Sequence, residues 1–316
     1  MALIEVENLK LYFMTRRGPA KAVDNIGFSV ETEKTLGLIG ESGCGKTTTA
    51  MALMKFVKPP GQIVDGSIRF MDKDIVPMSD EDIRQLRGKE ISIVRQEAQN
   101  ALNPVLTIGK QITEMILEHE SVTKETALAR AKKQLNIVGI NNQRINSYPH
   151  EFSGGMKQRA MAAIATACNP KLLILDEPTT GLDVVVQRQI LEMLGNLKKE
   201  LGLTAVFISH DLSVVAETCD RVAVMYAGKI MEESDTVSLY KNPLHPYSIA
   251  LIGAYPSLKG ERRQLKSIPG APPSLIDPPP GCRFAPRCEL AQDICTREEP
   301  VVKTIDGRRV ACHMVN

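Results

Sequence analysis

The stretch "TLGLIGESGCGKTTTAMALMKFV", residues 35–57, places a glycine-rich loop between two apolar segments. The first segment, 35–40, has the length of a β-strand, and the second, 46–57, has helical spacing and stops before Pro59. The loop "GESGCGKT" (40–47) matches G-x-x-x-x-G-K-[ST]. In this pattern glycines let backbone N–H groups point at phosphate oxygens, and the following helix adds its positive N-terminal dipole. The stretch therefore predicts a strand–loop–helix unit that binds the phosphates of a nucleotide.

The residue types in this loop predict ATP with Mg²⁺. Lys46 is expected to reach the β- and γ-phosphates, and Thr47 to hold the magnesium ion. The residues predicted to contact the nucleotide here are Gly40, Glu41, Ser42, Gly43, Cys44, Gly45, Lys46, Thr47 and Thr48.

The totals of the chain indicate an ordinary globular protein. Its 316 residues carry a net charge of +2 and contain no Trp, so neither a nucleic-acid surface nor a base-stacking platform is indicated. No apolar run approaches the ~20 residues that a membrane-spanning helix needs. The beginning, "MALIEVENLKLYF", alternates as a strand does and does not read as a signal peptide, so we expect a cytosolic protein.

Further apolar runs predict an α/β fold. The segments "KLLILD" (171–176) and "TAVFISH" (204–210) are apolar throughout, as in parallel strands covered by helices on both faces. Residues 1–33 and about 62–76 alternate with period two, which favours antiparallel strands, and 105–168 look mostly helical.

Composition changes near residue 240, after which prolines and four of the seven cysteines gather. We therefore predict a main domain at 1–240, with a helical subdomain at about 97–168, and a small C-terminal domain at 241–316.

The stretch "LLILDEP" (172–178) supplies two carboxylates at a strand end. Asp176 suits the Mg²⁺ shell, and Glu177 is placed to orient or deprotonate an attacking water. A strand-end Asp-Glu can also serve as a helix N-cap. The glycine-rich loop earlier in the chain favours the catalytic interpretation.

The stretch "EFSGGMKQR" (151–159) distinguishes between classes of nucleotide-binding protein. Ser153, Gly154 and Gly155 open a helical segment and offer a second anion-binding helix start. "SGG" followed by "QR", upstream of the Asp-Glu strand, resembles the signature motif of ABC-type ATPases. Four further positions resemble markers of that family in the same order along the chain: Phe13 as the ring against adenine (with Tyr12 as its rival), Gln96 as the Q-loop glutamine, Asp183 in the D-loop and His210 as the switch histidine.

This resemblance implies a fold and a mechanism. The fold is a RecA-like parallel sheet with an antiparallel β subdomain and an α-helical subdomain. Two such ATPase domains close head to tail, and each ATP lies between the loop of one and the Ser153 helix of the other. Glu177 polarises the water, His210 contacts the γ-phosphate, and Gln96 senses Mg²⁺ and the water. Lys46 completes the catalytic set.

One stretch departs from the family. Where the peptide-importer branch usually reads F-Q-D-P-M-x-x-L-N-P, this chain has "RQEAQNALNP" (95–104). Gln96 is kept, but Arg95 replaces the aromatic residue and Glu97-Ala98 replaces Asp-Pro. The departure indicates a coupling surface suited to an unusual membrane partner and leaves the ATP site intact.

The C-terminal region narrows the resemblance further. The segments "NPLHPYSIALIGAYPS" (242–257), "IPGAPPSL" (268–275) and "GCRFAPRC" (281–288) resemble the extension of ATPase subunits from dipeptide and oligopeptide ABC importers. Its four thiols are Cys282, Cys288, Cys295 and Cys312. A small proline-rich region needs a staple, and four thiolates suit either zinc or an iron–sulfur cluster. The C-x5-C-x6-C-x16-C spacing lacks the close pairs of zinc sites, and the resemblance implies a [4Fe–4S] cluster, with zinc or free thiols as alternatives.

The sequence therefore predicts the ATP-hydrolysing subunit of a membrane importer for di- or oligopeptides, on the cytoplasmic face of the membrane. The resemblance implies two membrane-spanning permease subunits, a second ATPase subunit, an extracytoplasmic binding protein and no nucleic acid. Nickel or oligosaccharides are alternative cargoes in the same branch. A soluble ABC ATPase of DNA repair or translation is the alternative from another class. Such proteins typically carry a coiled-coil insertion or a second ATPase domain, and this sequence shows neither of them and no basic stripe for nucleic acid.

Overall fold

The structure is a computed structural model that describes residues 1–95, 101–254 and 268–315. The chain divides into two compact units, each described by itself. Unit 1 comprises Met1, Glu31–Lys34 and Pro77–Phe207, and unit 2 comprises Ala2–Val30, Thr35–Val76 and Ile208–Asn316.

Unit 2 contains a four-stranded sheet near the start of the chain. Its order is β2-β1-β4-β5, and β1 pairs antiparallel with β4, with Ile4 opposite Phe70. The strands are β1 (Ala2–Thr15), β2 (Gly18–Glu31), β4 (Gly61–Phe70) and β5 (Lys73–Asp74). The antiparallel pairing predicted from the period-two alternation is confirmed.

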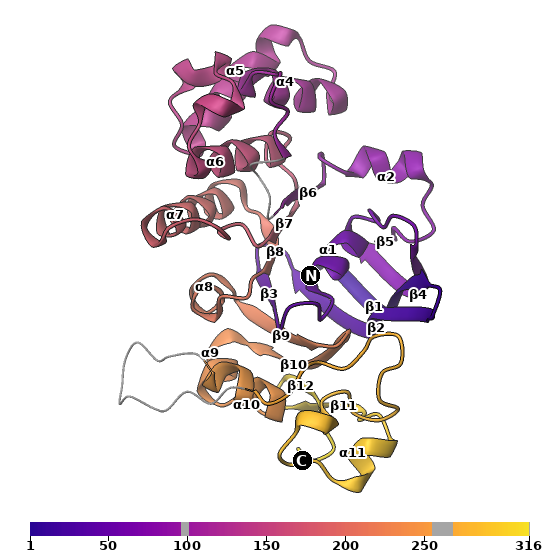
Figure 1. Ribbon diagram of the computed structural model, residues 1–316. Coiled ribbons are helices and arrows are strands. Elements are labelled where there is room, and N and C mark those ends of the chain that lie inside the picture. Colours follow the sequence, from indigo (N-terminus) through magenta and orange to yellow (C-terminus); the bar gives the residue numbers. More distant parts are fainter. Residues whose placement is uncertain (96–100, 255–267, 316) are drawn as a thin grey trace. The chain divides into compact units, whose positions relative to one another are not determined.

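Five further strands of unit 2 lie side by side in the order β11-β12-β10-β9-β3 (Figure 1). The strand before the glycine-rich loop, β3, is buried at all five positions and pairs parallel with β9. The strands are β3 (Thr35–Ile39), β9 (Arg221–Tyr226), β10 (Lys229–Asp235), β11 (Val302–Ile305) and β12 (Arg308–Ala311). The helices of this unit are α1 (Lys46–Leu53), α8 (Leu212–Thr218), α9 (Thr236–Lys241), α10 (Pro246–Gly253), the 3-10 turn η3 (Ala285–Arg287) and α11 (Asp293–Arg297).

Unit 1 combines short buried strands with a helical region. The strands lie in the order β8-β7-β6, and β6 pairs parallel with β7. They are β6 (Ile91–Val94), β7 (Leu172–Asp176) and β8 (Thr204–Ile208). The helices are α2 (Asp80–Leu86), α4 (Ile108–His119), α5 (Lys124–Ile137), α6 (Gly154–Ala165) and α7 (Val184–Leu201), with 3-10 turns η1 (Asn142–Asn146) and η2 (Pro149–Glu151). The predicted helical stretch 105–168 is confirmed by α4, α5 and α6.

The C-terminal region shares a sheet and a core with the rest of unit 2. β12 pairs antiparallel with β10, with Val310 opposite Glu232. Phe284 is buried, and its ring lies 5.3 Å from that of Tyr226 and 5.2 Å from that of Tyr247. A separate small domain at 241–316 is therefore not confirmed, and the boundary at residue 240 stays a prediction.

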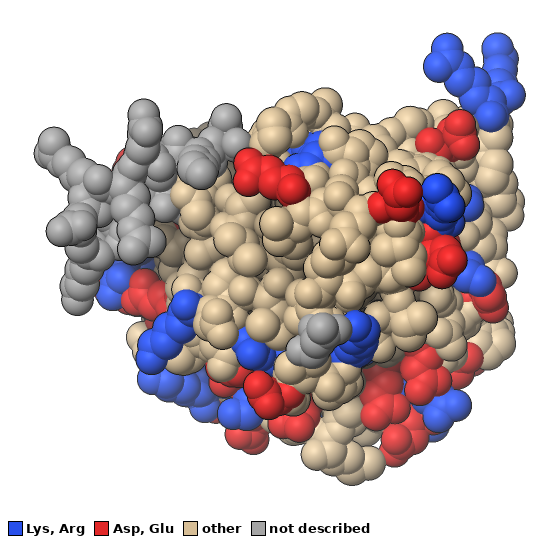
Figure 2. Space-filling view, turned by 90° about the horizontal axis from the view of Figure 1, so that it is seen from below, with Lys and Arg blue, Asp and Glu red and all other residues tan. Residues whose placement is uncertain are grey.

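Two observations bear on the expected partners. Among the described residues, no helix is both long enough and apolar enough to span a bilayer. Figure 2 shows acidic and basic side chains interspersed, mostly around the margin of the face it presents, with uncharged residues between them. This face therefore offers no surface of a single sign of charge, in keeping with the net charge of +2.

His245 caps helix α10 from a buried position. Its Nδ1 accepts a hydrogen bond from the Tyr247 N–H at 2.9 Å, so Nδ1 carries no proton. Burial lowers the pKa of His245 from 6.5 to about 4. Below pH 6.5 the unfolded chain therefore binds a proton that the folded chain takes up only near pH 4. As pH falls through this interval, the free energy of unfolding should decrease by up to about 3 kcal/mol from this group.

We predict that His245→Asn removes this part of the acid sensitivity, because an amide oxygen can accept the same hydrogen bond without titrating. The measurement is the urea midpoint at a series of pH values from 7 to 4. The variant should lose less stability over this range than the wild type, whereas the control His150→Asn, at an exposed histidine, should keep the wild-type slope. Parallel curves for His245→Asn and wild type would contradict the account.

Candidate active site

The glycine-rich loop joins β3 to α1 in unit 2, as predicted. Gly40, Gly43 and Gly45 have φ values of 147°, 77° and 110°, a region that favours glycine. A Cβ added at Gly40 would lie 2.0 Å from the carbonyl oxygen of Met225, and one at Gly45 would lie 2.3 Å from that of Ala22. The loop is therefore curled tightly against its own unit, and side chains at these two positions would unfold the curl.

The loop leaves one side open for a ligand. Ser42, Gly43 and Thr47 are exposed, Glu41 and Thr48 are half-buried, and Gly40, Cys44, Gly45 and Lys46 are buried. A Cβ built on Gly43 would meet no atom within 4 Å. Helix α1 begins without a side-chain cap and without an acidic residue in its first turn, so its positive end is not neutralised locally. This arrangement suits an anion.

Lys46 is 6% exposed, yet its ammonium group lies among backbone acceptors. Its Nζ donates to the carbonyl oxygens of Gly40 at 2.8 Å and Glu41 at 3.1 Å. A buried cation held by neutral carbonyls gains most when an anion such as a phosphate approaches.

His210 follows β8 and lies in the same unit as this loop. It is exposed, and its role as the switch histidine stays a prediction.

The two predicted carboxylates end strand β7 in unit 1. Asp176 is 3% exposed, whereas Glu177 is half-buried. Glu177 has a φ of 50°, a left-handed conformation that costs a non-glycine residue ~1–2 kcal/mol. Its Oε2 accepts a hydrogen bond from the Thr180 Oγ1 at 2.9 Å. Such strain at a carboxylate is typical of functional sites.

The structure identifies the cap of the next helix, which separates two interpretations of this pair. The N-cap of α7 is Asp183, whose side chain accepts from the Val186 N–H at 2.9 Å. Asp176 and Glu177 therefore do not cap α7. Asp183, the predicted D-loop residue, caps α7 in this single chain, and its D-loop role stays a prediction.

Ser153 is the N-cap of α6 and accepts from the Met156 N–H at 3.3 Å. The first turn of α6 contains no acidic residue, so its N-terminus also suits an anion. Gly155 allows α6 to approach α7, because a Cβ there would lie 2.5 Å from Val186 Cγ1. Ser153, Gly154 and Gly155 thus form a helix start as predicted.

Comparison with known proteins identifies the family. The family model described as "ABC transporter" matches residues 23–180, and "Oligopeptide/dipeptide transporter, C-terminal region" matches residues 231–295. The oligopeptide transport ATP-binding protein AppD of Bacillus subtilis is 45% identical over 316 residues, covering 99% of this chain and 96% of that protein. The chain belongs to the ATP-binding proteins of oligopeptide-type ABC transporters.

Other members and solved cassettes agree. OppD of Escherichia coli, an oligopeptide transport ATP-binding protein, is 42% identical over 313 residues, covering 98% of this chain and 93% of that protein. The dimeric post-hydrolysis structure of the ATP-binding cassette MJ0796 with ADP and Pi matches with a TM-score of 0.66 at 23% identity, over 74% of this chain and 98% of that one. The cbiO1 protein of Clostridium perfringens, part of an ABC transporter complex, also gives 0.66 at 25% identity, over 76% and 91%. The predicted ABC cassette fold is confirmed.

Two predicted site residues of this ABC ATP-binding protein need separate comment. Gln96, with the altered residues Glu97 and Ala98 beside it, lies outside the described residues. Phe13 lies on β1, half-buried and opposite Gly61 of β4.

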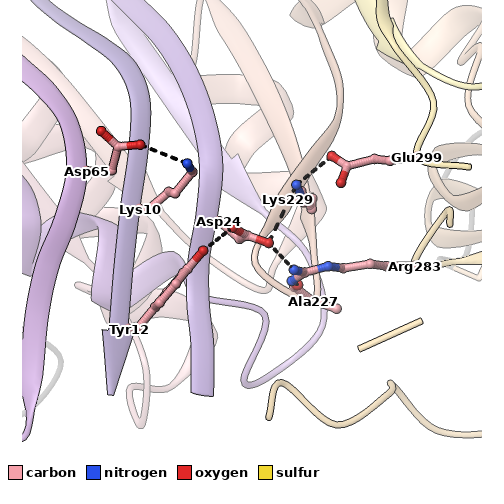
Figure 3. A network of polar contacts seen from close by, with 8 residues as sticks. All are labelled: Lys10, Tyr12, Asp24, Asp65, Ala227, Lys229, Arg283 and Glu299. Carbon is pink, nitrogen blue, oxygen red and sulfur yellow. Dashed lines mark hydrogen bonds and ion pairs between the residues drawn. The ribbon is translucent and has the colours of Figure 1, made fainter. Parts of the chain in front are cut away.

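The rival of Phe13 is held by a polar network. The Tyr12 hydroxyl donates to Asp24 at 2.6 Å, and Asp24 also pairs with Arg283 and, at 3.6 Å, with Lys229 (Figure 3). Burial alone would raise the pKa of Asp24, but the Tyr12 hydrogen bond and the two cations hold it below its usual range. The tyrosine therefore has a structural partner at its polar end, and the adenine role of Phe13, with Tyr12 as its rival, stays a prediction.

The predicted metal site at the four cysteines finds no support. Cys282, Cys295 and Cys312 are buried and Cys288 is half-buried. Burial raises the pKa of the Cys282 thiol to about 11. Within 1–95, 101–254 and 268–315, no three or more His, Cys, Asp or Glu side chains form a group that could hold a metal ion. The described residues therefore give no structural support to a [4Fe–4S] cluster or to zinc.

Sequence reasoning missed two contacts of the phosphate loop. The Glu41 carboxylate pairs with Arg287, and the Glu41 N–H donates to the Tyr247 hydroxyl at 3.0 Å. Both partners lie more than 200 residues further along the chain. The only signal was that Arg287 stands within the "GCRFAPRC" segment, where the cysteines alone were considered.

Proposed function

We propose that this chain hydrolyses ATP to drive a membrane importer of di- or oligopeptides. The observation that carries the proposal is the tightly curled loop 40–47. It contains the buried Lys46 and leads into helix α1, which has no side-chain cap. The full-length similarity to oligopeptide transport ATP-binding proteins supports the cargo class.

The residues divide the reaction between phosphate binding and water activation. The backbone N–H groups of the loop and Lys46 bind the phosphates. Glu177 orients the attacking water and accepts its proton, and His210 contacts the γ-phosphate. Gln96 monitors the same water.

Magnesium is expected with the nucleotide. Thr47, Asp176 and Gln96 offer hydroxyl, carboxylate and amide oxygens, the hard donors that this ion prefers. When bound, the ion offsets the negative charge that develops on the phosphates. The chain's own part is to present Asp176 at the end of β7 and Thr47 in the first turn of α1.

We propose that two ATPase subunits, identical or homologous, close head to tail so that the Ser153-Gly154-Gly155 helix start of one meets the γ-phosphate held by the other. What supports this is the anion-suited N-terminus of α6 and the dimeric state of the related cassette MJ0796. Hydrolysis removes the phosphate that joins the subunits. Two permease subunits, a peripheral position at the cytoplasmic face of the membrane and an extracytoplasmic binding protein complete the proposed system.

Cargo is tested by uptake into cells from which this gene has been deleted. Cells complemented with the wild-type gene should accumulate a labelled tetrapeptide, and cells complemented with Lys46→Ala should not. Uptake of labelled nickel or of an oligosaccharide in place of peptide would replace the cargo class and keep the ATPase. If cells complemented with Lys46→Ala took up all three cargoes as well as cells with the wild-type gene, the transport role would be contradicted.

The cysteine proposal rests on the sequence resemblance. We propose that four cysteines hold a [4Fe–4S] cluster, with a Zn²⁺ ion as the alternative. They are Cys282, Cys288, Cys295 and Cys312. Protein purified without oxygen should be brown and contain about four irons and four sulfides per chain. One zinc and no colour would leave the alternative, and neither metal would mean free thiols.

A further inference from the structure

The two arginines of the "GCRFAPRC" segment contact different parts of unit 2. Arg283 pairs with Asp24 and donates to the Ala227 carbonyl oxygen (Figure 3). Arg287 instead reaches the phosphate loop: its Nη1 and Nη2 donate to the two carboxylate oxygens of Glu41, at 2.6 and 3.0 Å. This is a two-pronged pair, the strongest geometry that arginine forms with a carboxylate.

The Arg287 side chain is fixed before it meets Glu41. It is 5% exposed, and its Nε donates to the Pro269 carbonyl oxygen at 2.7 Å. Its Nη1 also donates to the Tyr226 hydroxyl at 3.1 Å, and the guanidinium lies 5.6 Å from the centre of the Tyr226 ring. A guanidinium held at every side has little rotamer freedom left to lose, so it acts as a rigid anchor.

Glu41 connects this anchor to the phosphate-binding lysine. Its carbonyl oxygen accepts from Lys46 Nζ, and its N–H donates to the Tyr247 hydroxyl. The carboxylate, the carbonyl oxygen and the N–H of Glu41 thus all make hydrogen bonds. The partners of the carboxylate and of the N–H lie in the C-terminal half of the chain. The curl of the loop is fixed from outside the loop.

The charges give Arg287 a second effect. A carboxylate at the second position of a phosphate loop would repel the polyphosphate that the loop binds. The Arg287 guanidinium is always charged, and its pairing with Glu41 at 2.6 Å balances that carboxylate. Without the arginine, the half-buried Glu41 carboxylate would add an unbalanced negative charge to the loop.

We infer that Arg287 is a positioning residue for ATP: it anchors Glu41 and offsets its charge, so that the C-terminal region sets the affinity of the loop for polyphosphate. The inference rests on the proposed function, because it assumes that loop 40–47 binds ATP. Arg287 contacts the loop through the Glu41 carboxylate, so the inferred effect on ATP acts through Glu41.

The test is ATP affinity of the purified full-length chain, measured by calorimetry, with a rescue that a purely structural role would not produce. Arg287→Gln should weaken ATP binding about tenfold and adenosine binding less than twofold. Adding Glu41→Gln to Arg287→Gln should recover at least threefold of the lost ATP affinity, because the unbalanced charge is gone. Arg309→Gln is the matched control, since it removes a C-terminal arginine that pairs with Glu233 at 3.0 Å and should leave ATP affinity unchanged.

The outcomes separate this inference from the proposed function. Wild-type affinity in Arg287→Gln, or a double variant as weak as the single one, would overturn the inference. If Arg287→Gln does not fold, Arg287→Lys keeps a charge without the two-pronged geometry and should still weaken ATP binding severalfold, and wild-type affinity there would overturn it as well. A wild-type chain that binds no ATP would instead refute the proposed function.

Discussion

Glu177→Gln should lower the rate of phosphate release from ATP by ~10²–10⁴-fold while ATP still binds, because a general base typically contributes this much. Glutamine has nearly the shape of glutamate and can keep the hydrogen bond with Thr180. It cannot accept the proton of the attacking water. The defect should therefore lie in kcat, with ATP affinity close to that of the wild type.

The measurement is phosphate release combined with the oligomeric state in Mg-ATP. Without hydrolysis to separate them, closed ATPase dimers should accumulate in the variant. Glu192→Gln serves as the control, because it removes an exposed carboxylate of α7 that pairs with Arg188. Normal turnover in Glu177→Gln would remove Glu177 from the role of base.

Lys46→Ala should act on the other half of the reaction and weaken ATP binding by about 100-fold. A charge-assisted hydrogen bond contributes ~1.5–3 kcal/mol, and this ammonium is buried where its present partners are neutral carbonyl oxygens. Losing it removes the one side chain of the loop with a positive charge. Phosphate release should fall with it because little ATP is bound.

Equilibrium binding of ATP, with unfolding temperatures of the same samples, checks this expectation. Lys58→Ala, an exposed lysine shortly after α1, is the control and should bind ATP as the wild type does. An unchanged ATP affinity in a folded Lys46→Ala chain would show that the nucleotide binds elsewhere.

Local patterns were enough to predict most of the fold. The apolar run at 35–40, three glycines and the helical spacing after Lys46 together specify a strand, a curl and a helix within about twenty residues. The β7 strand with Asp176 at its end follows the same logic. Each of these signals depends on neighbours in the sequence, so no knowledge of tertiary structure was needed.

Long-range contacts were beyond such reasoning. Arg287 and Glu41 are 246 residues apart, and no spacing rule relates residues at that distance. β12 was missed because "RRVA" is short and basic rather than apolar, although pairing with β10 places it in a sheet. The C-terminal cysteines drew attention by their number, whereas the described residues show arginine and aromatic side chains making the contacts.

The central claim is that ATP hydrolysis by this chain powers peptide movement across a membrane. The most direct measurement places the purified transporter, with its permease subunits, in liposomes and follows a labelled tetrapeptide and phosphate release together. The account predicts peptide transport that requires Mg-ATP and stops, together with hydrolysis, in Glu177→Gln. Peptide transport that continues in Glu177→Gln, or wild-type hydrolysis with no peptide transport, would contradict it.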